Sequence, residues 1–149
     1  MKLYTSYFAR LRHFPKDLVG LSTAAFNPRW LQEGQDKNGA IWLDCPPLKP
    51  GIQCEGLCTG KCDPKHPQDC SFLKIYRKQL DQINFQEFYA HLEQLAEKIR
   101  KGENILNIDF AFLFFETPSN LCSERIIVQQ WFKDNGVEVQ EWVPTIMNG

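Results

Sequence analysis

The sequence has no long hydrophobic run and no apolar leader. No stretch of its 149 residues approaches the roughly 20 apolar residues that a membrane-spanning helix needs. Residues 1–8 lack the apolar centre of a secretory signal peptide. Together these absences predict a protein with no membrane partner that stays in the cytoplasm, where thiols are kept reduced.

An excess of charge of one sign is also absent. Lys and Arg number 17 and Asp and Glu number 18, which gives a formal net charge of −1. Such a balance gives no general attraction to phosphate backbones or anionic membranes. The sequence shows no internal repeat and no low-complexity segment. Its length suits one domain, residues 1–149, large enough to form a hydrophobic core.

The hydrophobic pattern predicts an α/β fold. Residues 110–115 are continuously hydrophobic, as expected for a strand in the middle of a sheet with helices on both sides. Shorter segments predict further strands near residues 3–8, 18–21, 40–43 and 137–142. Because strands alternate with helical segments, we expect a Rossmann-like three-layer domain with a mainly parallel sheet.

Capping residues predict the helices between these strands. Asn84 is a typical N-cap, Glu87 follows three residues later, and Gly102 would end this helix. Helical spacing of apolar residues predicts a second helix over residues 72–80. A third helix is expected to run from about residue 122 to Asp134.

The turn between the hydrophobic strand and this third helix is the strongest candidate site. In open α/β sheets ligands bind beyond the carboxyl ends of the strands, where Glu116 is expected. Cys122 would lie in or just before the first helical turn, where the pKa of a thiol tends to fall. Arg125 could donate to a phosphate or carboxylate. Glu124 could act as a general base or could simply stabilise the helix dipole.

Other candidate ligand-binding residues lie at or beyond the ends of the first two predicted strands. They are Ser6, Tyr7, Ser22 and Arg29. Structural roles are an open alternative for this whole set. Cys122 could be a small buried hydrophobe, and Arg125 could pair with Glu116 or Glu141.

Three segments of the chain carry a resemblance to a known family. They are Lys2–Tyr7, Leu21–Trp30, and Phe112–Arg125, which is followed by an amphipathic helix and Gly136–Val139. These segments resemble the domain of unknown function 488 family, in which a hydrophobic strand ends in a glutamate and a short loop leads to a Cys-His-Arg motif. The resemblance covers most of the chain outside residues 45–70 and implies that the functional site lies at residues 116–125.

The sequence departs from the family pattern at this motif. Cys122-Ser123-Glu124-Arg125 stands where the family has Cys-His-Arg, so the histidine that could activate the cysteine is absent. A serine cannot act as a base near neutral pH, which weakens a mechanism with Cys122 as the nucleophile. The family has no settled activity, so the resemblance indicates a site without indicating a reaction.

Residues 45–70 form a cysteine-rich insert that holds five of the six cysteines. Four thiols fall within this insert at short spacing: Cys54, Cys58, Cys62 and Cys70. In a reducing compartment such a cluster predicts a structural zinc site that staples the loop. An iron–sulfur cluster is the alternative metal group, and disulfides or free thiols are the remaining ones. His66 could replace one thiol, and Cys45 could be an additional ligand.

The leading functional hypothesis is an enzyme, a hydrolase or a transferase, that acts on a nucleotide, a nucleic-acid component or another phosphate-bearing substrate. Glu116 or Cys122 would carry the chemistry, and Arg125 with the helix N-terminus would hold the anion. The alternative is a non-catalytic, zinc-stapled module that binds a nucleic acid or a protein. The sequence leaves the substrate, the reaction and the oligomeric state open.

Overall fold

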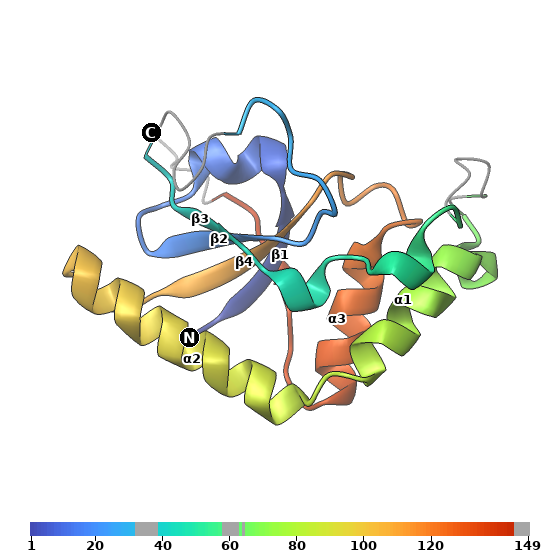
Figure 1. The fold of residues 1–149 in the computed structure, drawn as a ribbon. Coiled ribbons are helices and arrows are strands. Elements are labelled where there is room, and N and C mark those ends of the chain that lie inside the picture. Colours follow the sequence, from blue (N-terminus) through green and yellow to red (C-terminus); the bar gives the residue numbers. More distant parts are fainter. Residues whose placement is uncertain (32–38, 58–62, 64, 145–149) are drawn as a thin grey trace.

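A five-stranded, all-parallel sheet forms the centre of the protein, seen in a computed structural model that describes residues 1–31, 39–57, 63 and 65–144 (Figure 1). The spatial order of the strands is β3-β2-β4-β1-β5. Their bounds are Leu3–Tyr7 for β1, Leu18–Ser22 for β2, Trp42–Asp44 for β3, Asp109–Phe114 for β4 and Gln140–Glu141 for β5. The predicted α/β class with a parallel sheet is therefore confirmed.

The central strand is β4, as the continuous hydrophobic run predicts. It pairs in parallel with β1 on one side and with β2 on the other. Phe110, Phe112 and Phe114 belong to the core on one face of the sheet, and Ala111 and Leu113 belong to the core on the other face. Both faces of β4 are buried, so its side chains are hydrophobic on both faces and do not alternate between hydrophobic and polar.

Three α-helices cover the face that holds the phenylalanines: α1 (Ser71–Asp81), α2 (Phe85–Glu103) and α3 (Glu124–Asp134). The N-terminal end of α2 and the C-terminal part of α3 meet in an aromatic cluster. Phe85 lies 5.2 Å from Trp131 and 5.4 Å from Phe132, measured between ring centroids, and Phe112 lies 5.3 Å from Phe132. This cluster fixes α3 against the sheet, and with it the position of the helix N-terminus.

The opposite face of the sheet is covered differently from the prediction. A 3-10 helix, η1 (Phe8–His13), packs there through Phe8 and Leu11, and no α-helix lies on this face among the described residues (Figure 1). Only residues 8–17 connect β1 to β2. A parallel crossover with an α-helix needs a dozen residues or more, so this connection is too short for one.

The ends of α2 show one confirmed cap and one correction. The side chain of Asn84 accepts a hydrogen bond from the backbone N–H of Glu87 at 3.1 Å, as predicted. The helix does not end at Gly102, because it continues through Glu103 to a left-handed residue at Asn104, with φ 54°. Asparagine adopts this conformation more readily than most residues, so it can end a helix in place of glycine.

The insert folds into short 3-10 helices in its described part: η2 (Pro46–Leu48), η3 (Ile52–Cys54) and η4 (Pro67–Asp69). Helix α1 holds the first of these in place. The Tyr76 hydroxyl donates to the carbonyl of Leu48 at 2.5 Å, and the Gln79 amide donates to the carbonyl of Lys49 at 2.7 Å. Gln79 also accepts from the backbone N–H of Gly51 at 2.7 Å. Residues 48–51 are thereby positioned beside the ends of the strands.

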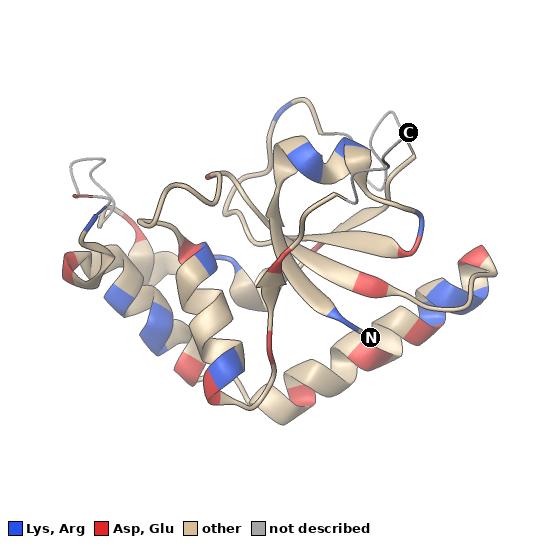
Figure 2. Ribbon diagram, turned by 180° about the vertical axis from the view of Figure 1, so that it is seen from behind, with Lys and Arg blue, Asp and Glu red and all other residues tan. Residues whose placement is uncertain are grey.

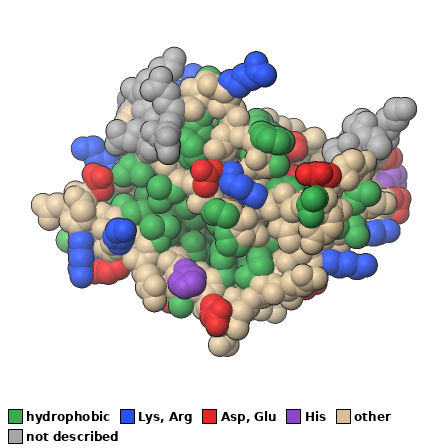
Figure 3. Space-filling model, viewed as in Figure 1, with side chains coloured by type: hydrophobic (Ala, Val, Ile, Leu, Met, Phe, Trp, Pro, Cys, Tyr) green, Lys and Arg blue, Asp and Glu red, His purple; other side chains and the backbone are tan. Residues whose placement is uncertain are grey.

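The surface mixes charges of both signs. Lys and Arg are interspersed with Asp and Glu along the outer sides of the helices (Figure 2). On the face seen in Figure 3, hydrophobic side chains gather between the edge strand β3 and α2. Within the described ranges, no helix combines the length and apolarity that crossing a membrane requires.

Candidate functional site

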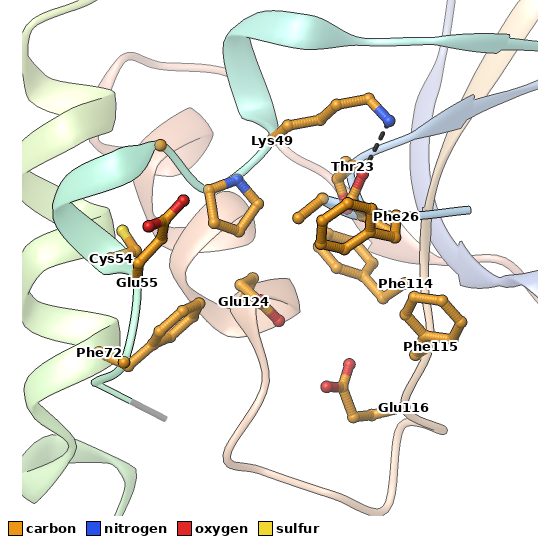
Figure 4. A pocket seen from close by; sticks show the side chains of 15 residues that line it. Thr23, Phe26, Lys49, Cys54, Glu55, Phe72, Phe114, Phe115, Glu116 and Glu124 are labelled. Atoms are coloured by element: carbon orange, nitrogen blue, oxygen red, sulfur yellow. Dashed lines mark hydrogen bonds between the residues drawn. The ribbon is translucent and has the colours of Figure 1, made fainter. Parts of the chain in front are cut away.

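A cavity of about 690 Å³ opens at the carboxyl ends of β2, β3 and β4 (Figure 4). Residues 23–26 follow β2, residues 49–51 and 54–56 follow β3, and residues 114–116 end β4. Phe72 from α1 and Glu124 from α3 complete the described lining. This volume is within the range of small-molecule pockets, and its place matches the edge at which open α/β sheets bind ligands.

The paths of the chain explain why a cavity forms at this edge. The described ends of the connection after β2 pack on the face that carries η1, where Ala24 and Ala40 are buried. The connection after β4 leads into α3, which packs on the opposite face. When the connections of two neighbouring strands run to opposite faces of the sheet, a crevice forms between the two loops.

Two carboxylates meet in this cavity, on Glu116 and Glu124. Ser123 is the N-cap of α3, and its hydroxyl oxygen accepts from the backbone N–H of Arg125 at 3.2 Å. The same hydroxyl donates to Oε2 of Glu116 at 3.1 Å. A single side chain therefore begins the helix and holds Glu116 beside the first helical residue, Glu124.

The environment of Glu124 favours its protonated form. The pKa of Glu124 is raised from 4.5 to about 7, chiefly by burial away from water and, as the second cause, by the negative charge of Glu116. A backbone hydrogen bond at the helix start and the charge of Arg125 act in the opposite direction and are the smaller effects. A carboxyl group that exchanges its proton near neutral pH can serve as a general acid or base.

Two further ionisable side chains interact with Glu124 from neighbouring elements. They are Cys54 on η3 and Tyr76 on α1. Burial raises the pKa of the Cys54 thiol, and burial raises the pKa of Tyr76 well above its ordinary value of 10. In the metal-free chain both groups are therefore neutral at pH 7, which leaves Glu116 and Arg125 as the charges that act on Glu124 in addition to its burial.

Lys49 is the only basic side chain among the described residues that line the cavity. Its Nζ lies 2.7 Å from Oδ1 of Asp44 and donates to the carbonyl of Ala24 at 2.7 Å. The hydrogen bond from Lys49 lowers the pKa of Asp44, so this carboxylate stays charged and neutralises the lysine. The remaining charged lining residues are Glu55, Glu116 and Glu124, which make the cavity acidic.

Phenylalanines form much of the rest of the wall. Phe114 is buried, whereas Phe115 is 56% exposed and Phe26 is 85% exposed. Figure 4 shows Phe26 over Phe114, with Phe115 beside them and Phe72 across the cavity. Phe115 is supported from behind by Phe8, whose ring centroid lies 5.1 Å away.

The structure brings Glu116 to the cavity but places several other predicted residues elsewhere. Ser22 is buried and donates to the Asn27 side chain, and Ser6 is fully buried in the sheet. Tyr7 is half-buried with the guanidinium of Arg10 5.0 Å from its ring centroid. Arg29 is exposed. None of these predicted residues lines the cavity as the described residues form it.

Arg125 takes the structural role that the sequence left open. It is only 3% exposed, and its Nη2 donates to the carbonyls of Ser6 and Glu116 at 3.2 and 2.7 Å. Its Nε lies 2.8 Å from Oε1 of Glu141, and its guanidinium lies 5.4 Å from the ring centroid of Phe114. Arg125 thus joins the start of α3 to β1, β5 and the end of β4, and it lies outside the cavity lining.

Cys122 lies just before the N-cap of α3, at the position that the sequence predicts. Its side chain is half-buried, and its backbone N–H donates to Oδ1 of Asn120 at 3.0 Å. It is not among the described residues that line the cavity.

The predicted metal ligands are only partly described. Cys54 is buried at the cavity wall with its Sγ 3.8 Å from Oε1 of Gln79, and Cys70 is buried as the N-cap of α1. Cys58 and Cys62 lie outside the described residues. Among those that are described, no group of three or more His, Cys, Asp or Glu side chains could hold a metal ion.

The two additional ligand candidates have other surroundings. His66 is exposed, with its Nδ1 2.6 Å from Oδ2 of Asp63. Cys45 is buried in the core, and this burial raises the pKa of its thiol to about 12. A thiolate, the form that ligates a metal, is strongly disfavoured at such a position.

Sequence patterns missed most of the cavity wall. Phe26, Lys49 and Glu55 lie in irregular segments after the strands, where no periodicity marks which side chains turn inward. One signal was available for Phe26 and Lys49, because both lie in the segments that begin at the ends of predicted strands. Glu124 was a candidate base in the sequence, and the structure adds that its carboxyl group enters the cavity.

Comparison of the chain with protein-family models, with curated proteins and with solved structures finds no significant match.

Proposed function

We propose that this cavity is the active site of an enzyme that acts on a small molecule, with Glu116 and Glu124 as its acid–base pair. The observation that supports this proposal best is that two carboxylates line one cavity, with phenylalanines in its wall, at the carboxyl ends of parallel strands. Paired carboxylates in unequal environments are a common arrangement for proton transfer in hydrolases and transferases.

The two glutamates differ in how they are held. Glu116 accepts a hydrogen bond from Ser123, which fixes the position of its charge beside Glu124. Glu124 extends from the first turn of α3 into the more buried part of the wall. In the proposed mechanism Glu124 gives or takes the proton, and Glu116 orients the substrate and keeps the pKa of Glu124 high.

The charge of the cavity limits which chemical groups of a substrate it can bind. In the described lining, the charge of Glu116 and Glu55, the shared proton equilibrium of Glu124 and a lysine neutralised by Asp44 favour a neutral or cationic group over a phosphate. If the substrate carries a phosphate, as the sequence leads us to expect, that phosphate lies outside this cavity in our proposal. Arg125 does not hold it, because its guanidinium is buried against carbonyls and Glu141.

The metal site and the family resemblance are separate proposals. We propose that Cys54, Cys58, Cys62 and Cys70 bind zinc, a donor set that suits a closed structural site. Cys54 belongs both to this set and to the cavity wall, so a bound zinc would brace the wall without taking part in the reaction. Membership of the domain of unknown function 488 family, a Rossmann-like layering and a cytoplasmic location stay predictions.

The proposal can be tested by incubating the protein with a small-molecule cell extract and following metabolites by mass spectrometry. The variants Glu124→Gln and Glu116→Gln keep the shapes of the side chains but remove their acid–base capacity. Glu93→Gln, an exposed position on α2, is the matched control. We expect a metabolite that wild type and the control consume and that Glu124→Gln does not. Equal consumption by wild type and Glu124→Gln would contradict the proposal.

A further inference from the structure

We infer that the cavity binds a flat aromatic ring whose edge carries two neighbouring N–H donors, as in an aromatic amidine or a guanine base. This inference rests on the proposed function, because it names the substrate class for the same cavity. It follows from three features of the described wall: exposed aromatic side chains on the loops after β2 and β4, carboxylates beside them and across from them, and an acidic balance of charge (Figure 4).

The aromatic side chains at the mouth expose apolar surface to water, which is energetically unfavourable. Phe26 is 85% and Phe115 is 56% exposed, and both lie on loops that follow neighbouring strands. A large apolar group kept in water beside a cavity is typical of a binding surface. A flat ring inserted between Phe26 and the wall formed by Phe114 would cover apolar surface on both of its faces (Figure 4).

The carboxylates determine which hydrogen-bonding groups the edge of the ring must carry. A carboxylate accepts hydrogen bonds and cannot donate them, and two parallel N–H groups match its two oxygens. Glu124 faces the cavity from the start of α3, Glu116 faces it from the turn after β4, beside Phe115, and Glu55 lies on the wall formed by η3 and the following turn. A ligand edge with adjacent N–H donors would satisfy one of these carboxylates with both bonds.

The charges exclude the main competing ligand chemistry. An aromatic carboxylate or phosphate would face three glutamates, and among the described lining residues the one lysine already pairs with Asp44. A ring without N–H donors would bury carboxylates without satisfying them, which is costly. A small cation without a ring would leave the aromatic wall uncovered. The ring and its donors are therefore both required.

The test is a binding titration of the full chain followed by NMR, with probes that separate these requirements. Benzamidine carries both the ring and the amidine donors, benzoate keeps the ring but reverses the charge, and acetamidine keeps the donors without the ring. We expect benzamidine to bind at least about tenfold more tightly than either of the others, with shifts at residues 114–116 and 124. Equal binding of benzamidine and benzoate, or no binding of benzamidine, would overturn the inference.

Side-chain variants test the same contacts from the side of the protein. Phe26→Ala removes an exposed ring and should not affect folding, and we expect it to weaken benzamidine binding at least about fivefold. Trp30→Ala is the matched control, because Trp30 is also an exposed aromatic residue on the same connection but does not line the cavity. Equal loss in both variants, or no loss in Phe26→Ala, would contradict stacking at this site.

Two further comparisons separate the possible ligand sources and separate this inference from the proposed function. Guanosine has the paired N–H donors and inosine lacks the amino group, so stronger binding of guanosine indicates a nucleobase, whereas benzamidine binding alone indicates a cationic aromatic ligand. Binding of benzamidine by a protein whose Glu124 titrates at the ordinary pKa would support this ligand class and refute the acid–base proposal. A raised pKa without benzamidine binding would refute only the ligand class.

Discussion

Replacement of Glu124 by glutamine should change how the stability of the protein depends on pH. In the folded chain the pKa of Glu124 is about 7, against an ordinary value of 4.5, because its carboxyl group is buried and lies beside Glu116. The folded state therefore holds this proton more tightly than the unfolded state does. Between pH 4.5 and 7 the unfolded chain releases the proton first, so the free energy of unfolding decreases as the pH rises.

The size of this effect follows from the two pKa values. Each pKa unit corresponds to about 1.4 kcal/mol, so the contribution of Glu124 amounts to about 3 kcal/mol and is lost by about pH 7. Glu124→Gln has no such proton and should lack this slope. The free energy of unfolding of the variant minus that of wild type should therefore rise by about 3 kcal/mol between about pH 4.5 and about pH 7.5.

Urea unfolding followed by tryptophan fluorescence at several pH values measures this difference directly. Subtraction of the wild-type curve from the Glu124→Gln curve removes contributions from groups that titrate alike in both proteins. Glu93→Gln, at an exposed site, serves as the control and should give a flat difference. A flat difference for Glu124→Gln as well would refute the reasoning, because Glu124 would then titrate as an ordinary surface carboxylate.

Three other changes test the structural account. Arg125→Met should cost about 3–5 kcal/mol in urea unfolding, because it removes the cation that pairs with the partly buried Glu141 carboxylate and the donor to two carbonyls. The double variant Arg125→Met, Glu141→Met should cost less than the single one, and a double variant that is less stable would contradict this. Asn84→Ala should cost about 1 kcal/mol by removing the N-cap of α2, and an unchanged urea midpoint would argue against the cap. Protein purified without chelator should contain about one zinc per chain by atomic absorption, Cys58→Ser should lose it and Cys122→Ser should keep it; metal-free wild type would refute the zinc proposal.

Local signals in the sequence predicted the framework of the fold well. The hydrophobic run at residues 110–115 could only be satisfied in the centre of a sheet, and β4 lies there. The Asn84 cap depends on contacts within one helical turn, so neighbouring residues were sufficient to predict it. The helix end was wrong by two residues, because the left-handed conformation fell on Asn104 and not on Gly102.

The covering of the second face depended on information that periodicity does not carry. Whether a connection becomes an α-helix or a 3-10 turn depends on how far the chain must travel to the next paired strand. The sequence predicts β1 and β2 but does not show that β4 lies between them. The connection therefore contains only the short 3-10 helix Phe8–His13 where an α-helical layer was expected.

The candidate site was predicted in position but only partly in composition. The turn at residues 116–125 does border the cavity, and Glu116 and Glu124 both line it. Arg125 shows why side-chain roles were harder to predict. Its position in the first turn of α3 suits an anion-binding residue, yet its partners are Ser6, Glu116 and Glu141, which only the tertiary structure brings together. Phe26 and Lys49 reach the wall through loops that carry no periodic pattern.

The most direct test of the central claim is a carbon-13 NMR titration of the glutamate side-chain carboxyls. We predict that one carboxyl, assigned to Glu124 by its absence in Glu124→Gln, has a midpoint near pH 7 in wild type. In Glu116→Gln this midpoint should move down, because the neighbouring negative charge is gone. A midpoint near 4.5 for Glu124 in both proteins would contradict the account of this cavity as an acid–base site.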